Sequence, residues 1–378
     1  MSEVFDTMNV STIYNPRMRE GVIDHLLLTG PEPVGKLIDW GQYDKDFGYY
    51  QQAVVMEEDY QTTPGVNADF GRTLGKTTWR DLLARYESPR ILIAGDGTGE
   101  LTLQCLHALP KEDRGRVQLT VVDRTEHLLK IQRDNIRSHA TDSQVTYVAS
   151  DIISFLENQS PEQYDYAQHN ELLDALPLHF YKKNSQGLIQ EMYVHYENDA
   201  LHFTLEEPEQ TQATAWFLDS FAPSIGSRVK VYQPDVAYLS HLHAKTLTPG
   251  GSLTMIDYYK RGPTNYSDIP VLGWDLERKI TPEQHEDNYY STKYTREGLA
   301  SAMQAIGMVD VTLLVDLNPI TQTLQKEGKV DVQNQLLFMV QNRQNARHAL
   351  KIMMQTFWHT NFSVVRFTKN AVAEHYKP

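Results

Sequence analysis

Three observations predict an α/β fold of the Rossmann-like type, with a mostly parallel sheet between two layers of helices. Short apolar runs alternate with helix-compatible segments between residues 90 and 257, and that alternation is typical of parallel sheets. A glycine-rich loop follows the first apolar run and leads directly into a helix-compatible segment. Acidic residues close the second and third runs, at the edge where such sheets bind ligands.

The individual strands are expected where an apolar run ends in a glycine, a turn or a polar residue. Five runs form the parallel part of the sheet: ILIAG (91–95), VQLTVVD (117–123), VTYVASD (145–151), YDYAQHN (164–170) and SLTMID (252–257). Two later runs complete a seven-stranded sheet whose last strand runs antiparallel: VDVTLLVD (309–316) and FSVVRFT (362–368).

Two regions are expected along the chain. Residues 1–88 form a helical N-terminal region that contributes to the cleft for cofactor and substrate, and its last segment is the apolar-periodic TLGKTTWRDLLARYES. Pro89 follows that segment, and residues 89–378 form the domain that carries the sheet.

Two insertions are expected within this second region. Residues 187–207 alternate apolar and polar side chains, which predicts an antiparallel hairpin in an insertion at about 184–230, after the fourth strand. The stretch 263–295 is polar, with several tyrosines and prolines and no clear period. It is interpreted either as a lid or as a long surface connection.

Composition and charge exclude several classes of protein. The chain has 35 Lys and Arg against 49 Asp and Glu, and the net charge of −14 disfavours a nucleic-acid partner. The single cysteine, Cys105, excludes an intrachain disulfide and lies among leucines, as a core residue does. No apolar stretch approaches the ~20 residues of a membrane span, and the N-terminus resembles neither a signal peptide nor a transit peptide. We therefore expect a cytoplasmic protein that acts on a small molecule or a basic protein.

No metal site is expected. His241 and His243 lie two residues apart in a helical pattern, so their side chains point to different faces of the helix. The sequence H-E-x-x-H does not occur, and the remaining histidines are scattered.

The central motif is the glycine loop ILIAGDGTGEL, in which Gly95, Gly97 and Gly99 separate a strand from a helix. Glycines at such a turn allow a ligand to approach the backbone and the helix N-terminus closely. The spacing is G-x-G-x-G, so the dinucleotide fingerprint G-x-G-x-x-G is not met. Asp96 and Glu100 would repel a pyrophosphate, but they suit a ligand that carries an ammonium and a sulfonium group. The alternative is a tight turn that binds no ligand.

Two further acids extend the expected ligand site. Asp123 closes the second strand, where a carboxylate can accept hydrogen bonds from both hydroxyls of an adenosine ribose. Asp151 closes the third strand, where it would meet the adenine amino group. The alternative for both is a helix N-cap or a solvated loop acid. S-adenosylmethionine combines a ribose, an adenine, a cationic centre and an amino acid end, so these positions predict it as the cofactor.

The segment NELLDALPLHF, which follows the fourth strand, carries the expected chemistry. Asn170, Glu171 and Asp174 bring an amide and two carboxylates to the carboxyl edge of the sheet. Beside a methyl donor, such a cluster can orient a nitrogen nucleophile and take up its proton. Asp257, at the end of the fifth strand, is a third catalytic candidate. The alternatives are a turn shaped by Asp174, a helix cap at Glu171, and an Asp257 carboxylate satisfied by backbone amides.

Several segments of the chain resemble one known family. NELLDALPLHF is close to the family's NEFFDALP, GDGTGEL matches its glycine loop, and LTPGGSLTMIDYY is similar to the entry to its fifth strand. Further similar segments are FGYY (47–50), TTPGVNADFGRTLG (62–75) and HLLKIQ (127–132). These motifs resemble the MidA-like S-adenosylmethionine-dependent methyltransferases, which include the mitochondrial arginine methyltransferase that assists assembly of respiratory complex I.

The sequence departs from this family at three places near the expected substrate side. Ile93 stands where the family has a glutamate, and Tyr259 stands where its IDYG motif has a glycine. The family's segment Q-D-I-T-A-H-V-D-F appears here as DNYYSTKYTREGL, without its histidine and its second aspartate. The family's acceptor is therefore a weaker expectation than its cofactor.

The resemblance implies a class I methyltransferase fold in which Thr62 joins the glycine loop, Asp123, Asp151 and Asn170 in holding S-adenosylmethionine. It also implies methyl transfer to a nitrogen of a protein arginine. Two alternatives stay open: methylation of a small metabolite or natural-product intermediate, and a non-catalytic assembly factor that binds the cofactor to stabilise its own fold. The expected partner is an acceptor protein or a small molecule, and a homodimer is one assembly that stays open.

Overall fold

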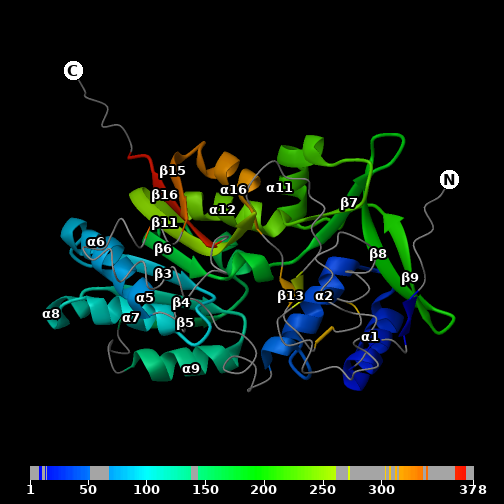
Figure 1. Ribbon diagram of the computed structural model, residues 1–378, viewed down its shortest axis with the longest axis horizontal. Coiled ribbons are helices and arrows are strands. Elements are labelled where there is room, and N and C mark those ends of the chain that lie inside the picture. The colour runs from blue at the N-terminus through cyan, green and yellow to red at the C-terminus, as the bar shows by residue number, and fades with distance from the viewer. Residues whose placement is uncertain are drawn as a thin grey trace. The chain divides into compact units, whose positions relative to one another are not determined.

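Two compact units make up the chain, and each is described on its own. The computed structural model describes residues 8–10, 13, 15–51, 68–137, 144–260, 271–272, 303, 306–307, 311–312, 315–334, 338 and 362–371 (Figure 1). One unit, here called the sheet unit, comprises Gln61–Leu173, Leu239–Arg261 and Val315–Pro378. The other, here called the hairpin unit, comprises Met1–Tyr60, Asp174–Tyr238 and Gly262–Leu314.

The sheet unit is built on a mixed sheet in the strand order β5-β4-β3-β6-β11-β16-β15. Neighbouring strands from β5 to β11 run parallel, and β16 runs antiparallel to β11 as predicted. Their bounds are β3 (Arg90–Ala94), β4 (Gln118–Asp123), β5 (Val145–Ala149), β6 (Tyr164–Asn170), β11 (Leu247–Lys260), β15 (Gly328–Asn334) and β16 (Phe362–Lys369). Every residue of β6 is buried, because this central strand is covered on both faces.

One predicted strand was assigned to the wrong segment. Residues 309–316 were expected to form the strand before the last one, but the strand that pairs with β16 is β15, which runs antiparallel to it. Within the predicted segment, β14 (Val315–Asp316) pairs in parallel with the last two residues of β11, Tyr259 and Lys260. The sequence of β15, GKVDVQN, has charged and polar residues because β15 is an edge strand, so no apolar run marked it.

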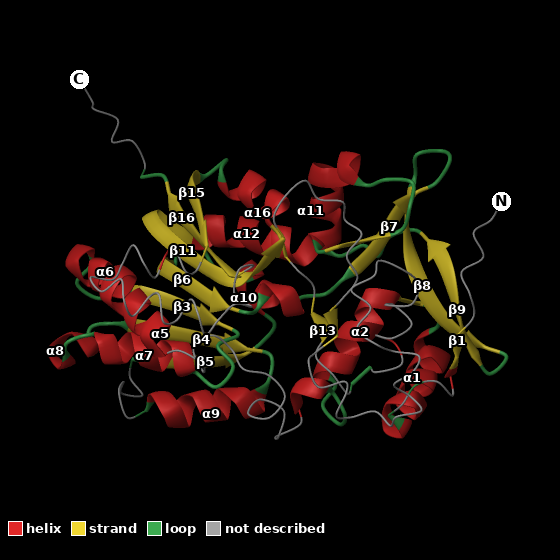
Figure 2. Ribbon diagram, in the orientation of Figure 1, coloured by secondary structure: helices red, strands yellow, loops and turns green. Residues whose placement is uncertain are grey.

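Helices cover both faces of this sheet (Figure 2). Gln168 and His169, neighbours on β6, point to opposite faces. Gln168 contacts Trp79 of η3, a π-helix, and His169 contacts His243 of α12. The helical segments of the sheet unit are α5 (Ala68–Leu74), η3 (Gly75–Trp79), α6 (Arg80–Arg85), α7 (Glu100–Ala108), α8 (Lys111–Arg114), α9 (Glu126–Ile136), α10 (Ile152–Glu157) and α16 (Leu317–Leu324), with α12 (Pro234–Thr246) shared between the units.

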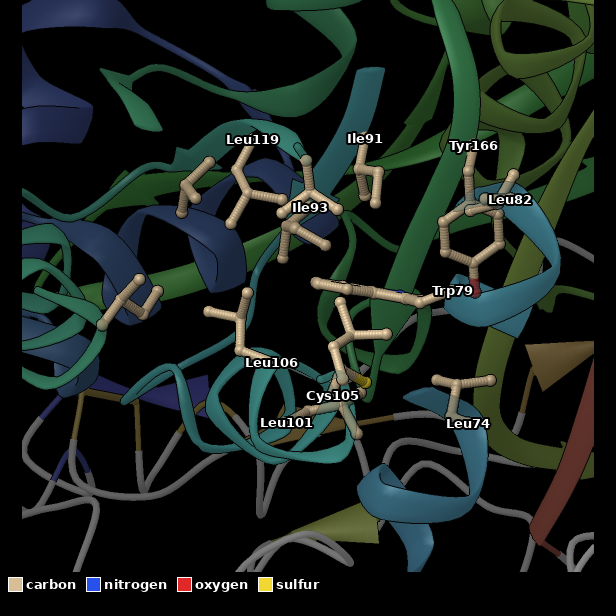
Figure 3. Close-up of a cluster of buried hydrophobic side chains, with 14 of the residues drawn as sticks. Leu74, Trp79, Leu82, Ile91, Ile93, Leu101, Cys105, Leu106, Leu119 and Tyr166 are labelled. Carbon is tan, nitrogen blue, oxygen red and sulfur yellow. The ribbon is translucent and has the colours of Figure 1, made fainter. Parts of the chain in front are cut away.

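The core of the sheet unit lies between the sheet and the helices α5 to α7 and α9 (Figure 3). Trp79 and Tyr166 are fully buried there, and Cys105 packs among the leucines of α7, as the sequence predicted for a core residue. Each of these side chains removes apolar area from water, worth about 25 cal/mol per Å². This packing fixes β3 and α7, the two elements that the glycine loop joins.

The hairpin unit contains the predicted antiparallel hairpin. β8 (Ile189–Glu197) and β9 (Ala200–Glu206) pair antiparallel, and Asn198 and Asp199 between them both have positive φ, of 51° and 59°. Two positive φ angles are the mark of a type I′ turn, which matches the twist of paired strands. The hairpin belongs to a sheet in the order β1-β9-β8-β7-β10, in which β2 also pairs with β8.

The N-terminal residues belong to this same sheet. β1 (Met8–Asn9) pairs with β9, and β2 (Glu32–Pro33) pairs with β8, so this region adds strands as well as the expected helices. The boundary expected at residue 88 does not coincide with this division, because Gln61 onward belongs to the sheet unit. The other elements of the hairpin unit are α1 (Pro16–Thr29), α2 (Val34–Tyr43), η2 (Tyr49–Gln51), β7 (His179–Lys183), α11 (Gln212–Phe221), η5 (Ala222–Ser224), β10 (Lys230–Tyr232), β12 (Val271–Leu272) and β13 (Val311–Thr312), with η4 (Leu173–Ala175) at the boundary of the units.

Two further expectations concern a lid and membrane-spanning helices. The proposed lid, 263–295, lies outside the described residues except for β12, which pairs antiparallel with β13. Among the helices that the structure describes, none is long and apolar enough to cross a bilayer.

Candidate functional site

The glycine loop forms the turn from β3 to α7. Gly95, Gly97 and Gly99 all have positive φ, of 59°, 54° and 83°. Residues other than glycine rarely adopt this backbone conformation. A Cβ at Gly95 would lie 2.7 Å from Leu172 Cδ1. Gly99 immediately precedes α7, whose N-terminus therefore opens at the loop. The three predicted glycines are thus required by the backbone conformation itself.

Asp123 lies at the end of β4, beside this loop. One carboxylate oxygen, Oδ1, accepts a hydrogen bond from the Thr125 backbone N–H at 2.9 Å. The other, Oδ2, accepts one from Gln132 Nε2 at 3.1 Å, and the same nitrogen also donates to the Gly97 carbonyl at 2.8 Å. Burial raises the pKa of Asp123 to about 6, although these hydrogen bonds favour its charged form.

Asp96 lies inside the glycine loop and has the higher pKa of the two. The pKa of the Asp96 carboxyl is raised to about 7, mainly by burial and in smaller part by the negative charges of Asp123 and Glu100. Its Oδ2 accepts a hydrogen bond from the Thr102 backbone N–H at 3.1 Å. A positive charge close to Asp96 would therefore stabilise its charged form and offset the repulsion from Asp123 and Glu100.

Asp151 occupies the position that the sequence left open between two roles. It is the N-cap of α10, and its Oδ1 accepts hydrogen bonds from the N–H groups of Ile153 and Ser154 at 2.9 and 3.0 Å. This is the capping alternative, worth about 1 kcal/mol to the helix. If Asp151 also binds an adenine amino group, as predicted, the acceptor is its other carboxylate oxygen, Oδ2.

The end of β6 carries an amide and a carboxylate in contact with each other. Asn170 Nδ2 donates to Glu171 Oε1 at 3.0 Å, and the Asn170 Oδ1 atom is buried without a partner among the described residues. Glu171 has a φ of 51°, and its backbone N–H donates to the Ile256 carbonyl of β11 at 2.8 Å. A left-handed conformation costs a non-glycine residue roughly 1–2 kcal/mol. Such strain at a sheet edge often accompanies a functional role.

Asp257 was expected to close the fifth strand, but it lies within β11, which continues to Lys260. Both oxygens of its carboxylate accept hydrogen bonds from backbone N–H groups. Its Oδ2 accepts a hydrogen bond from the Leu173 N–H at 2.9 Å, and its Oδ1 accepts one from the Tyr258 N–H at 2.7 Å. The side chain is fully buried. This geometry matches the alternative of a carboxylate satisfied by backbone amides, so the catalytic role of Asp257 stays a prediction that the geometry does not favour.

Two predicted site residues, Asp174 and Thr62, are not placed beside Glu171 by the structure. Asp174 is buried in η4 and is the first residue of the hairpin unit, whereas Glu171 belongs to the sheet unit. Thr62 lies outside the described residues. Their assigned roles stay predictions.

Two polar contacts in the sheet unit were not predicted from the sequence. Gln132 lies on α9, nine residues after Asp123, and only the folded chain brings its amide to the glycine loop. His169 Nε2 and His243 Nε2 lie 2.8 Å apart, and burial lowers the pKa of His169 to about 3, so this pair is neutral. Among the described residues no group of three His, Cys, Asp or Glu side chains could hold a metal ion.

The residues at this edge fit S-adenosylmethionine, the cofactor that the sequence predicts. The glycines leave the loop backbone without side chains, and the orphaned Asn170 Oδ1 lacks a donor. Asp96 and Asp123 are carboxylates of raised pKa that would gain from a cationic ligand. The sulfonium and ammonium of S-adenosylmethionine supply that charge, and its ribose supplies hydroxyl donors for Asp123.

Comparison with family models gives one match. Residues 75–335 match a family described as "Putative S-adenosyl-L-methionine-dependent methyltransferase". The matched segment is more than half of the chain and includes the glycine loop, Asp123, Glu171 and Asp257. A comparison with curated proteins finds no match.

Comparison with solved structures shows the same fold in two structures from Burkholderia thailandensis. One is described as a "likely methyl transferase" bound to S-adenosyl-homocysteine; it is 17% identical, with a TM-score of 0.65, and the match covers 95% of this chain and 93% of that one. The other is the native structure of an uncharacterized protein, 16% identical with a TM-score of 0.61 and the same coverage. At these identities the likeness concerns the fold.

Proposed function

This chain belongs to the S-adenosyl-L-methionine-dependent methyltransferase family that matches residues 75–335, and from that premise we propose that it methylates a nitrogen of a protein arginine. Membership makes it an enzyme that uses S-adenosylmethionine as its cofactor. When bound, this cofactor supplies an electrophilic methyl carbon attached to a sulfonium. The residues of the chain then have to hold the cofactor, orient the acceptor and receive its proton.

The cofactor is held, in this proposal, by the edge formed by the glycine loop and β4. Asp123 accepts hydrogen bonds from the ribose hydroxyls, and the loop backbone around Gly97 lies against the amino acid end. Asp96 stabilises the positive charge of the ligand, since the nearby carboxylates of Asp123 and Glu100 raise its pKa and a cation would offset their effect. Asp151, Asn170 and Thr62 complete the cofactor contacts that the sequence predicts.

The acceptor step depends on Glu171. A guanidinium has a pKa above about 12, so its nitrogen is a poor nucleophile at neutral pH. The Glu171 carboxylate can hold the positive charge on the nitrogens that do not react, and it can accept the proton as the methyl group is transferred. Asp174 is the second predicted carboxylate for this step. We assign Asp257 to holding the Leu173 backbone, which belongs to the same strand-four segment.

One observation carries the proposal: a carboxylate held in a strained backbone conformation at the end of β6. Glu171 has a φ of 51° and is bound by Asn170 Nδ2, whose own oxygen has no partner in the described part of the chain. Strain of this kind persists only where the surrounding structure holds it, and it clusters at active sites. The net charge of −14 also favours a basic acceptor protein.

Transfer of a labelled methyl group into a cell extract tests the proposal. The chain is incubated with extract and methyl-labelled S-adenosylmethionine, and the products are separated into protein and small molecules. We expect label in the protein fraction that acid hydrolysis releases as methylarginine. Label confined to small molecules would instead support the metabolite alternative. Bound cofactor without any transfer would support the assembly factor.

A further inference from the structure

The side chain of Gln132 joins the two parts of the site that the proposed function assigns to the cofactor. Its Nε2 donates to the Gly97 carbonyl at 2.8 Å and to Asp123 Oδ2 at 3.1 Å. The side chain is fully buried on α9, and a Cβ at Gly99 would lie 3.4 Å from Gln132 Cα, so α9 packs directly against the loop. Both neighbours are acceptors, and this fixes which end of the amide faces them.

The oxygen of the Gln132 amide indicates that this side chain does more than stabilise the fold. Gln132 Oε1 is buried and has no hydrogen-bond partner among the described residues. A buried acceptor without a partner costs stability, so an apolar side chain of similar size would suit a core position better. The two donated hydrogen bonds are what the glutamine adds, and both end on atoms of the proposed cofactor site.

We propose that Gln132 is a positioning residue. Its amide connects the glycine loop to Asp123 and orients the Asp123 carboxylate to accept hydrogen bonds from the ribose hydroxyls. The inference rests on the proposed role of Asp123. Gln132 itself does not need to touch the cofactor, since the groups it binds, the Asp123 carboxylate and the Gly97 carbonyl, belong to the proposed cofactor site.

The charges around Asp123 make this role measurable. Asp96 acts on it from the glycine loop and Arg124 from the next position in the chain, and Glu100 of α7 acts on Asp96. The Thr125 N–H and Gln132 Nε2 both stabilise the charged carboxylate. A protonated Asp123 accepts hydrogen bonds poorly, so cofactor affinity is expected to fall as the pH drops below the pKa of about 6. Removing the Gln132 donor would raise this pKa and move the loss of affinity to higher pH.

The test measures the affinity for S-adenosylhomocysteine, which shares the ribose and adenine, by calorimetric titration from pH 5.5 to 8.5. For Gln132→Met we expect about tenfold weaker binding at pH 7, with the inflection of the pH profile raised by about one pH unit. Gln132→Glu keeps the size of the side chain and places a carboxylate beside Asp123, so it shifts the inflection in the same direction. A merely structural role would lower the melting temperature without moving this inflection.

Two further variants complete the test. Gln144→Met is a matched control, because Gln144 is also a buried glutamine whose Nε2 donates to two backbone carbonyls, those of Arg114 and Val117. It should lower the melting temperature and leave the affinity and its pH profile as in the parent. Asp123→Asn should bind more weakly, with a profile that no longer inflects near pH 6.

The two proposals fail in different ways. Parent-like affinity in Asp123→Asn would overturn the ribose assignment and with it the proposed function of this edge. Weak binding in Asp123→Asn together with parent-like profiles in both Gln132 variants would overturn only the role of Gln132.

Discussion

Two groups of acidic side chains, one around His179 in the hairpin unit and one around Asp96 in the sheet unit, differ in how their negative charge is balanced. In the hairpin unit, Glu191 Oε1 lies 2.7 Å from His179 Nδ1, and Asp235 Oδ2 lies 3.3 Å from His179 Nε2. These two acids raise the pKa of His179 to about 10, against the effect of its burial, so the histidine is their counter-ion. In the sheet unit, the negative charges of Asp123 and Glu100 both raise the pKa of Asp96.

The difference teaches where a ligand is needed. A buried acid with a built-in cation is complete in the folded chain, and removing either partner leaves an uncompensated buried charge. A buried acid whose neighbours are acids has a raised pKa and becomes fully charged only when a cation arrives. On this basis we interpret the cluster of His179, Glu191 and Asp235 as structural, and we propose that a cationic ligand binds close to Asp96.

The largest expected effect is on the stability of the hairpin unit. Glu191→Gln leaves the buried His179 charge with one partner, and removing one member of a buried ion pair typically costs about 3–5 kcal/mol. Urea unfolding measures this loss, and Glu197→Gln, an exposed position on the same strand, should change the free energy of unfolding by less than about 0.5 kcal/mol. A loss of that small size in Glu191→Gln would show that the His179 cluster does not stabilise the fold.

The same cluster predicts a pH dependence. The folded pKa of His179, about 10, lies above its usual value of 6.5. Its contribution to stability is therefore fully present below about pH 6.5 and is lost as the pH rises toward 10. The parent should lose this part of its stability across that window in urea titrations, whereas Glu191→Gln, with a lower histidine pKa, should lose it at lower pH. Parallel curves for the two proteins would contradict the assignment.

In the sheet unit the largest expected effect is on turnover. Glu171→Gln is nearly isosteric and should lower kcat by about 10²-fold while the affinity for S-adenosylmethionine stays within a factor of about three, as loss of a general base does. Glu162→Gln is the matched control, because Glu162 also has a positive φ, of 62°, but lies exposed before the other end of β6. Parent-like turnover in Glu171→Gln would show that the carboxylate at the end of β6 has a structural role and not a catalytic one.

Asp257 should behave in the opposite way. Asp257→Asn replaces one of two acceptors with a donor, so either the Leu173 or the Tyr258 N–H loses its partner. We expect a loss of about 1–3 kcal/mol in the free energy of unfolding and little change in cofactor affinity. Unchanged stability with a 10²-fold lower kcat would restore the catalytic role predicted from the sequence.

The sequence is most informative where local backbone geometry sets the residue type. Gly95, Gly97 and Gly99 could be predicted because a turn with positive φ between a strand and a helix demands glycine. The hairpin of β8 and β9 could be predicted because apolar and polar residues alternate along residues 187–207. Both signals are local in the sequence.

Partners brought together from distant parts of the chain could not be predicted. The sequence shows Asp257 in an apolar run that forms a strand, but it does not show the hydrogen bond that Asp257 accepts from the Leu173 N–H, 84 residues away. The bond of Gln132 to the loop depends on the packing of α9, and the cation of Glu191 comes from a neighbouring strand. The edge strand β15 was missed because its polar sequence shows no buried face.

The most direct test of this comparison is proton release on cofactor binding by the parent and Asp96→Asn. Calorimetric titrations with S-adenosylmethionine at pH 7, in buffers of different ionisation enthalpy, measure it. Since the pKa of Asp96 is about 7, a cation that drives it to the charged form should release roughly half a proton in the parent. Asp96→Asn should release almost none, bind about tenfold more weakly, and melt at the same or a higher temperature. Equal proton release and equal affinity in the two proteins would contradict the view that this edge is built for a cationic cofactor.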